Sequence, residues 1–288
     1  MAISRGSRGG CRLRGRLARP SQWTPGGLLS WIKSLLAELG VRPSKRLGQS
    51  FLYHPRGFEF FTEHIQGGSW LEVGTGPGLL TLAASRRANI VLGVELDYNM
   101  ACAASSIAYP NASIVVGDGV RLLESWSGGG VYSNTPYHLS STIISRVARN
   151  NSVEKAVLGV QKEVAYRILA SPGGEEYGRL TLLVRRYFYA KLAGVIPRRW
   201  FYPPPEVDGA VIVLSRRRSW RPGDEVFEQL TACLFSGRNK LAYKMAERCA
   251  CIDGARARRV LGDKRVRELD VGEVEWILEN GECTSGRG

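Results

Sequence analysis

The sequence predicts an α/β protein in which a parallel sheet is followed by a small helical domain. Two observations support this prediction. Short apolar runs alternate with helical patterns up to about residue 170, as is typical of parallel strands joined by crossover helices. Beyond Arg216 the strand signals stop, and apolar residues recur at helical spacing only. We therefore expect a sheet domain over residues 28–215 and a helical domain over residues 216–288.

The N-terminal residues 1–27 contain six arginines and no acidic residue. We interpret them as a disordered basic arm, because their glycines disfavour a helix. The whole chain has a formal net charge of +14, which favours a polyanionic partner such as RNA. After the arm, leucine and isoleucine recur at helical spacing from Leu28 to Leu39, and Gly40 is a stop signal.

The first strand of the sheet is expected at Ser69–Val73, directly before a glycine-rich loop at Gly74–Gly78. Glycines at such a turn let the backbone approach a ligand closely, and the following helix offers free N–H groups. The loop has the spacing G-x-G-x-G, whereas loops that bind a dinucleotide pyrophosphate have G-x-G-x-x-G. This spacing favours S-adenosylmethionine over a nicotinamide dinucleotide.

Polar side chains follow the next three expected strands, residues 89–94, 113–116 and 131–133. Glu95 follows the first of them, Asp118 the second and Asn134 the third. Ligands bind at the carboxyl ends of parallel strands, so this series predicts a binding site at one edge of the sheet. Glu95 is placed to accept hydrogen bonds from ribose hydroxyls, and Asp118 to accept one from an adenine amino group. The alternative is that either acid caps the helix that follows it.

Asn134-Thr135-Pro136-Tyr137 is the most informative stretch of the chain. The amide oxygen of Asn134 and the carbonyl of Thr135 can both accept from an exocyclic NH2 group, and the ring of Tyr137 can stack on the base that carries it. The alternative is an Asx-type turn before proline, with Tyr137 packed in the core.

The rest of the chain completes both domains. A fifth strand is expected at residues 155–160, and residues 187–196 and 209–215 are expected to form an antiparallel edge. The six cysteines include no C-x-x-C pair, and the three histidines are scattered, so we expect no metal site and mostly free thiols in a reducing cytoplasm. No apolar run is long enough to span a membrane, and membrane binding is not expected.

Several motifs resemble those of the ribosomal RNA small-subunit adenine N6,N6-dimethyltransferases of the KsgA/RsmA type, and they follow one another in the same order as in that family. The resemblance extends over most of residues 42–245. It rests on the segments Arg42–Leu52, Glu72–Thr81, Asn134–Tyr137, Val160–Arg167, Tyr177–Leu180, Phe201–Asp208 and Leu234–Leu241.

The resemblance implies a Rossmann-like sheet of the class I S-adenosylmethionine-dependent methyltransferases. It implies a catalytic motif of Asn134, Pro136 and Tyr137. Tyr137 is expected to stack on one face of the substrate base, and Phe201 is the candidate for the other face. The alternative for Phe201 is that it is buried where the edge strands turn. It implies that the cofactor is bound by Gln49, Ser50, Leu52, Gly74, Gly76, Glu95, Asp118 and Asn134. The chain departs from the usual family residues at Ser50, Thr135, Glu206 and Gly209, but none of these departures removes a required functional group.

The implied function is dimethylation of adenine N6 in small-subunit rRNA during ribosome biogenesis. The implied partner is the immature small ribosomal subunit, met by a monomer in the cytoplasm, with the helical domain binding RNA. Three alternatives remain open from the residues. They are a large-subunit rRNA adenine methyltransferase, a non-catalytic nucleic-acid-binding assembly or transcription factor of the same fold, and a nicotinamide-dependent oxidoreductase.

Overall fold

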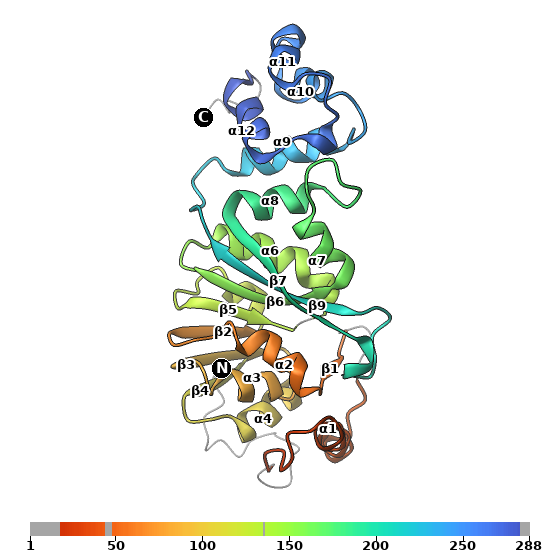
Figure 1. Ribbon diagram of the computed structural model, residues 1–288. Helices are drawn as coiled ribbons and strands as arrows, with labels where there is room; N and C mark the ends of the chain where they lie inside the picture. Colours follow the sequence, from red (N-terminus) through yellow and green to blue (C-terminus); the bar gives the residue numbers. More distant parts are fainter. Residues whose placement is uncertain (1–17, 44–47, 135, 283–288) are drawn as a thin grey trace. The chain divides into compact units, whose positions relative to one another are not determined.

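The structure is a computed structural model that describes residues 18–43, 48–134 and 136–282 (Figure 1). The chain divides into two compact units. Unit 1 contains the residues up to Ala165 together with Lys191–Arg216, and unit 2 contains Tyr166–Ala190 together with the residues from Arg217 on. The expected domains placed all of residues 28–215 together, so the structure differs for residues 166–190.

Seven of the described strands form the main sheet, in the order β4-β3-β2-β5-β6-β9-β7. The pairs from β4 to β6 are parallel, and β9 pairs with β6 in the antiparallel direction. The strands are β2 (Ser69–Val73), β3 (Ile90–Glu95), β4 (Ala112–Val116), β5 (Gly129–Ser133), β6 (Lys155–Gln161), β7 (Phe188–Ile196) and β9 (Gly209–Arg216). The predicted α/β fold with an antiparallel edge is confirmed.

Helices cover the sheet in two groups. The first group contains α2 (Pro55–Thr62), α3 (Leu79–Ala84) and α4 (Tyr98–Ile107), and the second contains α5 (Gly119–Leu122) and α6 (Ser140–Arg149). The helix α7 (Lys162–Leu169) follows β6 directly. Central strands are apolar on both faces, as expected for a parallel sheet between two helical layers: β2 buries Trp70, Leu71 and Val73.

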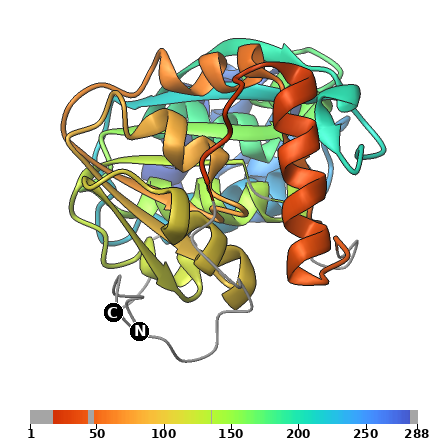
Figure 2. The same cartoon turned by 90° about the horizontal axis from the view of Figure 1, so that it is seen from below.

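The helix α1 (Pro25–Leu39) lies across one end of the strands (Figure 2). Its start is fixed by the side chain of Thr24, which accepts from Gly27 N–H, and its end by Gly40 with φ of 62°. It buries the predicted apolar stripe of Leu28, Ile32, Leu35, Leu36 and Leu39.

Only part of the predicted basic arm lies within the described residues, and that part is held in place. The guanidinium of Arg19 donates to the carbonyls of Ile107 and Ala108 at 2.8 and 2.9 Å and lies 4.0 Å from the ring centre of Tyr109. A cation satisfies free carbonyls at a helix C-terminus, here that of α4, which explains this docking. An arm running to residue 27 is therefore too long, and residues 1–17 lie outside the described residues.

A two-stranded antiparallel ribbon joins two distant segments of unit 1. It consists of β1 (Phe51–Leu52) and β8 (Phe201–Tyr202), with Phe51 opposite Tyr202 and Leu52 opposite Phe201. The short helix η2 (Arg198–Trp200) leads into β8. We call this pair of strands the β1–β8 ribbon.

Unit 2 is helical and has its own core. It contains α8 (Arg179–Tyr187), α9 (Glu225–Phe235), α10 (Ala242–Ala250), α11 (Gly254–Leu261), η3 (Val266–Glu268) and α12 (Val271–Asn280). Tyr177 and Leu182 pack into the same apolar cluster as Phe227 and Leu234. This packing explains why residues 166–190 belong with the C-terminal helices, although strands precede and follow them in the sequence.

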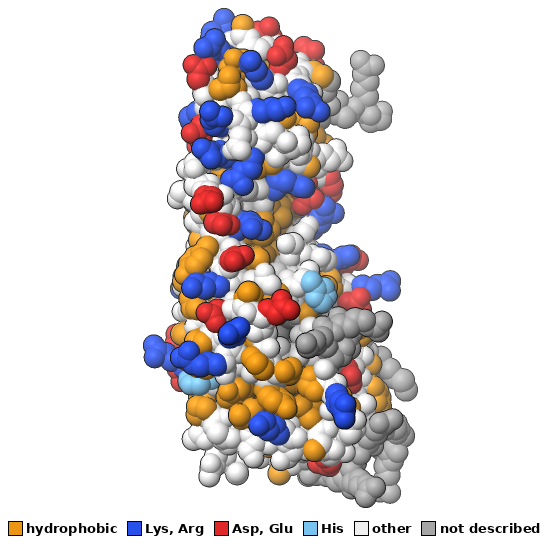
Figure 3. All heavy atoms as spheres, turned by 90° about the vertical axis from the view of Figure 1, so that its right-hand side faces the viewer, with side chains coloured by type: hydrophobic (Ala, Val, Ile, Leu, Met, Phe, Trp, Pro, Cys, Tyr) orange, Lys and Arg blue, Asp and Glu red, His pale blue; other side chains and the backbone are white. Residues whose placement is uncertain are grey.

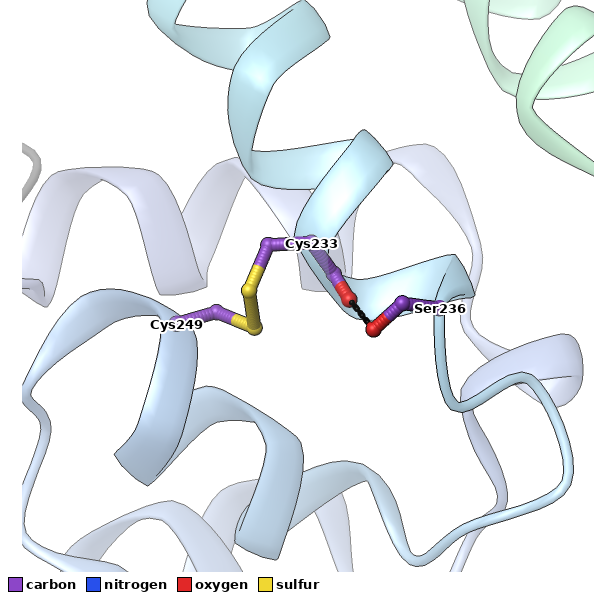
Figure 4. Close-up of a disulfide and its surroundings, with 3 residues drawn as sticks. All are labelled: Cys233, Ser236 and Cys249. Carbon is purple, nitrogen blue, oxygen red and sulfur yellow. Dashed lines mark hydrogen bonds between the residues drawn. A yellow bond between two sulfur atoms is a disulfide. The ribbon is translucent and has the colours of Figure 1, made fainter.

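The expectation of mostly free thiols is wrong for the described cysteines. Cys233 on α9 and Cys249 on α10 form a disulfide (Figure 4), and Cys251 is also disulfide-bonded. Cys102 is a buried free thiol. The packing of α9 against α10 brings the two α-carbons of the first pair to 5.8 Å, a distance suited to a disulfide, and cysteine spacing alone could not reveal it.

None of the helices that the structure describes is long and apolar enough to cross a lipid bilayer. Among the described residues, no group of three or more His, Cys, Asp or Glu side chains is arranged to hold a metal ion.

Candidate active site

A cavity of about 430 Å³ opens at the carboxyl ends of β2, β3, β4 and β5. Its walls come from the glycine-rich loop, from the residues that follow β3, β4 and β5, and from the segment around β1. All eight residues expected to bind the cofactor line this cavity, namely Gln49, Ser50, Leu52, Gly74, Gly76, Glu95, Asp118 and Asn134. The structure thus brings together residues that lie far apart in the sequence, from Gln49 to Asn134.

The glycine-rich loop needs its glycines for two reasons. Gly74, Gly76 and Gly78 all have positive φ, of 77°, 53° and 89°, which side-chain-bearing residues rarely adopt. In addition, a Cβ on Gly78 would lie 2.6 Å from the α-carbon of Ala104, so any side chain there would collide with α4. The loop can therefore follow the cavity wall closely.

Glu95 holds the loop and faces the cavity at the same time. Its Oε2 accepts from Gly76 N–H at 2.7 Å and its Oε1 accepts from Asp97 N–H at 2.9 Å. Burial raises the pKa of Glu95, and these N–H groups partly offset the increase. The Leu96 N–H is a third partner of the carboxylate. Because a carboxylate has about four acceptor sites, the group can still accept a hydrogen bond from a ligand hydroxyl.

Of the two acids that were expected either to bind the cofactor or to cap the next helix, Asp118 acts as a cap and Glu95 does not. Asp118 does cap α5, since its Oδ1 accepts from the N–H groups of Val120 and Arg121 at 2.9 and 3.2 Å. The helix after Glu95 is instead capped by Asp97, whose Oδ1 accepts from Asn99 and Met100. Glu95 is thus left for the loop and the cavity, whereas Asp118 combines capping with a place in the cavity wall.

Asn134 follows β5 and has its amide oxygen over the neighbouring strand β6. A Cβ on Gly159 of β6 would lie 2.7 Å from Asn134 Oδ1, so only glycine leaves room for this position of the amide. The preceding residue, Ser133, is buried and donates to the Val73 carbonyl at 2.9 Å, which ties the end of β5 to the end of β2. No role was expected for Gly159 from the sequence, although a glycine inside a strand often marks a close approach.

The other residues of the expected catalytic motif are placed differently. Pro136 lines the cavity and packs against Gly48, where a Cβ would lie 2.4 Å from the proline Cβ. Thr135, whose carbonyl was expected to accept a hydrogen bond, lies outside the described residues. Tyr137 begins the short helix η1 (Tyr137–Leu139) and does not line the cavity.

The two expected stacking residues are not brought to the cavity with the others. The Tyr137 hydroxyl is buried with no hydrogen-bond partner in the described structure, close to Gly209, and burial raises its pKa. Phe201 is 4% exposed and belongs to the apolar core of unit 1. The core alternative for Phe201 therefore fits its placement.

Ser50 donates its hydroxyl hydrogen to the Pro203 carbonyl at 2.6 Å. This bond ties the cavity wall to the segment that follows β8. The hydroxyl oxygen can still accept a hydrogen bond from a ligand amine.

Glu72 is a second residue that the sequence reading missed. It lies on β2 and lines the cavity, yet it is only 1% exposed. Its Oε2 accepts from the hydroxyls of Thr81 and of Tyr132, the latter at 3.0 Å. Burial raises the pKa of Glu72 to about 8, so the side chain is mostly protonated and neutral at pH 7. An acid within the apolar run Trp70-Leu-Glu-Val73 was the available signal.

The chain is similar in sequence to known proteins. A family model described as "Ribosomal RNA adenine dimethylase" matches residues 44–274. A protein of Aeropyrum pernix, described as a probable ribosomal RNA small subunit methyltransferase A, is 41% identical over 72% of this chain and 77% of its own length. A protein of Moorella thermoacetica, described as ribosomal RNA small subunit methyltransferase A, is 32% identical over 75% of this chain and 82% of its own.

Two solved structures share the fold. A dimethyladenosine transferase from Plasmodium falciparum has a TM-score of 0.70 at 23% identity, covering 80% of this chain and 96% of that one. The 23S rRNA methyltransferase ErmE has a TM-score of 0.63 at 23% identity, covering 81% of this chain and 99% of that one. At this level of identity, both similarities show the fold alone.

Proposed function

Because this chain belongs to the ribosomal RNA adenine dimethylase family, we propose that its cavity binds S-adenosylmethionine and that Asn134 presents an adenine N6 amine of small-subunit rRNA to it. The family uses S-adenosylmethionine as the methyl donor. The observation that carries the proposal is the convergence of Glu95, Asp118 and Asn134 on one cavity beside the glycine-rich loop.

The residues of the cavity fit this cofactor. The volume of about 430 Å³ is within the usual range for small-molecule sites. In the proposal, Glu95 accepts hydrogen bonds from the ribose hydroxyls, Asp118 accepts one from the adenine amine, and Ser50 accepts one from the methionine end. Gln49 and Leu52 complete the wall around the methionine end.

The proposed chemistry depends on orientation. The bound S-adenosylmethionine supplies a methyl group that its sulfonium already activates. The adenine N6 amine is a poor nucleophile, because its lone pair is delocalised into the ring. Asn134 Oδ1 accepts an N6 hydrogen and turns the nitrogen lone pair toward the methyl carbon. Holding two reactants in line can lower a barrier by up to roughly 7–11 kcal/mol.

No strong base is needed at the nitrogen, because the proton of the product can leave to water. Pro136 fixes the backbone that carries Asn134, and the carbonyl of Thr135 is the proposed second acceptor. Tyr137 follows Pro136 directly, and we propose that its ring stacks on the substrate base. The burial of Phe201 argues that it supports the β1–β8 ribbon instead of the base.

The small subunit is the favoured source of the rRNA. The Aeropyrum pernix and Moorella thermoacetica relatives both carry small-subunit names at more than 30% identity, whereas the similarity to ErmE extends to the fold alone. We propose further that a monomer acts on immature small subunits in the cytoplasm, with unit 2 binding RNA. Disulfides also occur in intracellular proteins of hyperthermophiles, so those in unit 2 are compatible with this location.

The proposal is tested by Asn134→Ala. We expect methyl transfer from labelled S-adenosylmethionine to immature small subunits to fall by at least roughly 10²–10³-fold, the scale seen when one positioned hydrogen-bonding group is removed from an active site. Calorimetry should show nearly unchanged cofactor affinity. The matched control is Asn89→Ala, which removes an exposed amide before β3 and should leave turnover unchanged. Turnover in Asn134→Ala equal to that of the control would refute the amine-binding role, and mapping of the modified nucleosides identifies the substrate RNA.

A further inference from the structure

A second hollow, of about 550 Å³, lies beside the β1–β8 ribbon in unit 1. We call it the Tyr202 groove. It is lined by the aromatic rings of Tyr53 and Tyr202, by Arg198 and Arg199, and by Glu206 and two prolines. The expected function gave no role to Tyr53, Tyr202 or the two arginines.

The ribbon is a wall shared by the groove and the cavity. Phe51 and Leu52 of β1 line the cavity, and their partners on β8, Tyr202 and Phe201, line the groove. Paired strands lie about 4.8 Å apart, so these lining residues of the two hollows are neighbours across the ribbon. The bond from Ser50 to the Pro203 carbonyl adds a second link across this wall.

The groove has the chemistry of a site for a single-stranded nucleotide. Proteins bind single-stranded nucleic acid by stacking bases on aromatic rings and by placing cations along the phosphates. Tyr202 is half-buried at the groove, and the Lys33 ammonium lies 5.3 Å from its ring centre. The side of the molecule that carries α1 and β1 in Figure 1 faces the viewer in Figure 3, where Lys and Arg side chains border a group of hydrophobic ones.

The aromatic side of the groove is held rigidly. Tyr53 donates its hydroxyl hydrogen to the Arg199 carbonyl at 2.5 Å, and its N–H donates to the Trp200 carbonyl at 3.0 Å. The ring of Trp200 stacks on His54, with 3.8 Å between ring centres and 8° between planes. A surface fixed in this way loses little conformational entropy when a base binds to it.

The charges of the groove favour RNA over a protein partner. The exposed Arg199 guanidinium makes no hydrogen bond or ion pair with any residue that the structure describes, so it is free to meet a phosphate. Arg198 donates to the Glu206 carbonyl at 3.2 Å, which holds the proline-rich segment in place. Among the described residues that line the groove, Glu206 is the one acid, and its carboxylate can accept from a base amine.

We propose that the Tyr202 groove is a second RNA subsite, which binds a nucleotide flanking the target adenine in the single strand that enters the cavity. This inference rests on the proposed function. It assigns the stacking role to Tyr202 and the phosphate contact to Arg199, and it gives Phe201 the task of supporting the ribbon from its buried side.

The test measures the affinity of the full-length protein for a single-stranded RNA decamer containing the target adenine, together with KM and kcat for methyl transfer. In Tyr202→Leu, we expect roughly 5- to 150-fold weaker RNA binding, the range found when one base loses its aromatic platform, and a raised KM. Tyr202→Phe keeps the ring and should restore both values. Unchanged S-adenosylmethionine affinity in each variant shows that the cavity is intact.

Arg199→Ala should lower the slope of log affinity against log salt concentration by about 0.7, the value for one phosphate contact with a single strand. The matched control is Arg87→Ala, which removes an exposed arginine before β3 and should leave the affinity for the decamer as in the wild type. The exposed position of Arg199 keeps the test usable if Tyr202→Leu fails to fold.

The outcomes separate this inference from the proposed function. If the wild type methylates RNA and neither Tyr202→Leu nor Arg199→Ala changes affinity or KM relative to Arg87→Ala, the second subsite is refuted and the proposed function stands. If both variants lose affinity for the decamer while the wild type methylates no RNA, the groove is an RNA site and the proposed function fails.

Discussion

Units 1 and 2 use their buried polar groups for different purposes. In unit 1 the buried acid Glu72 faces the cavity, and the half-buried Glu95 holds the glycine-rich loop. In unit 2 the buried charges of Arg186 and Asp224 hold helices together, and a disulfide joins α9 to α10. The comparison indicates that unit 1 owes its stability mainly to apolar burial under a sheet, so its polar groups are available for ligands. The smaller unit 2 needs polar and covalent links for stability.

The central group of unit 2 is the guanidinium of Arg186. Its side chain is 3% exposed and bonds Asp224 at 2.9 Å and Glu275 at 3.1 Å, which links α8 to α9 and α12. The guanidinium also lies 3.9 Å from the ring centre of Phe227. Arg218 forms a further ion pair with Glu275.

The largest expected effect is that of Arg186→Ala. Removing one partner of a buried ion pair leaves an uncompensated charge, so we expect the free energy of unfolding to fall by roughly 3–5 kcal/mol. Urea unfolding followed by circular dichroism measures this value. Arg259→Ala, on the exposed surface of α11, is the matched control and should change it little. Equal stability of the two variants would remove the proposed difference between the units.

The next effect is that of Cys233→Ala combined with Cys249→Ala. The disulfide closes a loop with a sequence separation of 16, for which the lost constraint on the unfolded chain corresponds to about 3 kcal/mol. The midpoint temperature of thermal unfolding of unit 2 should fall, while unit 1 should still bind S-adenosylmethionine. Treating the variant with a reductant then isolates the contribution of the Cys251 disulfide. A double variant as stable as the wild type would contradict the expectation.

Glu95→Ala tests the polar groups of unit 1 through binding. We expect S-adenosylmethionine affinity to fall by about 1.5–3 kcal/mol, the usual contribution of hydrogen bonds to a charged group. Isothermal titration calorimetry measures the change. Glu63→Ala removes an exposed acid beyond the end of α2 and serves as the control. Equal affinities in the two variants would reject the ribose contact.

Glu72→Gln gives the smallest effect and tests the sign of a pH dependence. The folded-state pKa of Glu72 is raised to about 8, compared with 4.5 as its ordinary value. Between these values the folded protein keeps a proton that the unfolded chain has lost, so the contribution of Glu72 to stability is present below pH 4.5 and is lost as pH rises toward 8. From pH 6 to pH 7, the stability of the wild type relative to Glu72→Gln should fall by about 1.4 kcal/mol. A difference that stays constant with pH would show that Glu72 is ionised in the fold.

The sequence predicted unit 1 better than unit 2 for a physical reason. The strands of the unit 1 site are recognisable as short apolar runs that end in a glycine or a polar residue. Because parallel strands end at one edge of a sheet, these end residues are expected together; they are Gly74, Glu95, Asp118 and Asn134. The links of unit 2 depend on which helices pack together. The pairing of Cys233 with Cys249 has no local signal in the sequence.

The same limit explains the differences within unit 1. Phe201 and Tyr202 are adjacent in a proline-rich segment, and only the pairing of β8 with β1 decides which ring is buried. The importance of Gly159 likewise depends on a contact between two strands. In contrast, Glu72 could have been identified, since an acid inside an apolar strand requires an explanation.

The position proposed for the Asn134 amide depends on strand register, because Gly159 leaves room for it only where it lies opposite. Ser133, just before Asn134, is paired with Leu158, so Gly159 is the next residue along β6. A shift of one position in this pairing would bring Leu158 or Val160 opposite the Asn134 amide. Their branched side chains would then displace the amide from its position. If Asn134 orients the amine as proposed, a mutation that shifts this register abolishes methyl transfer, while S-adenosylmethionine still binds at the other strand ends.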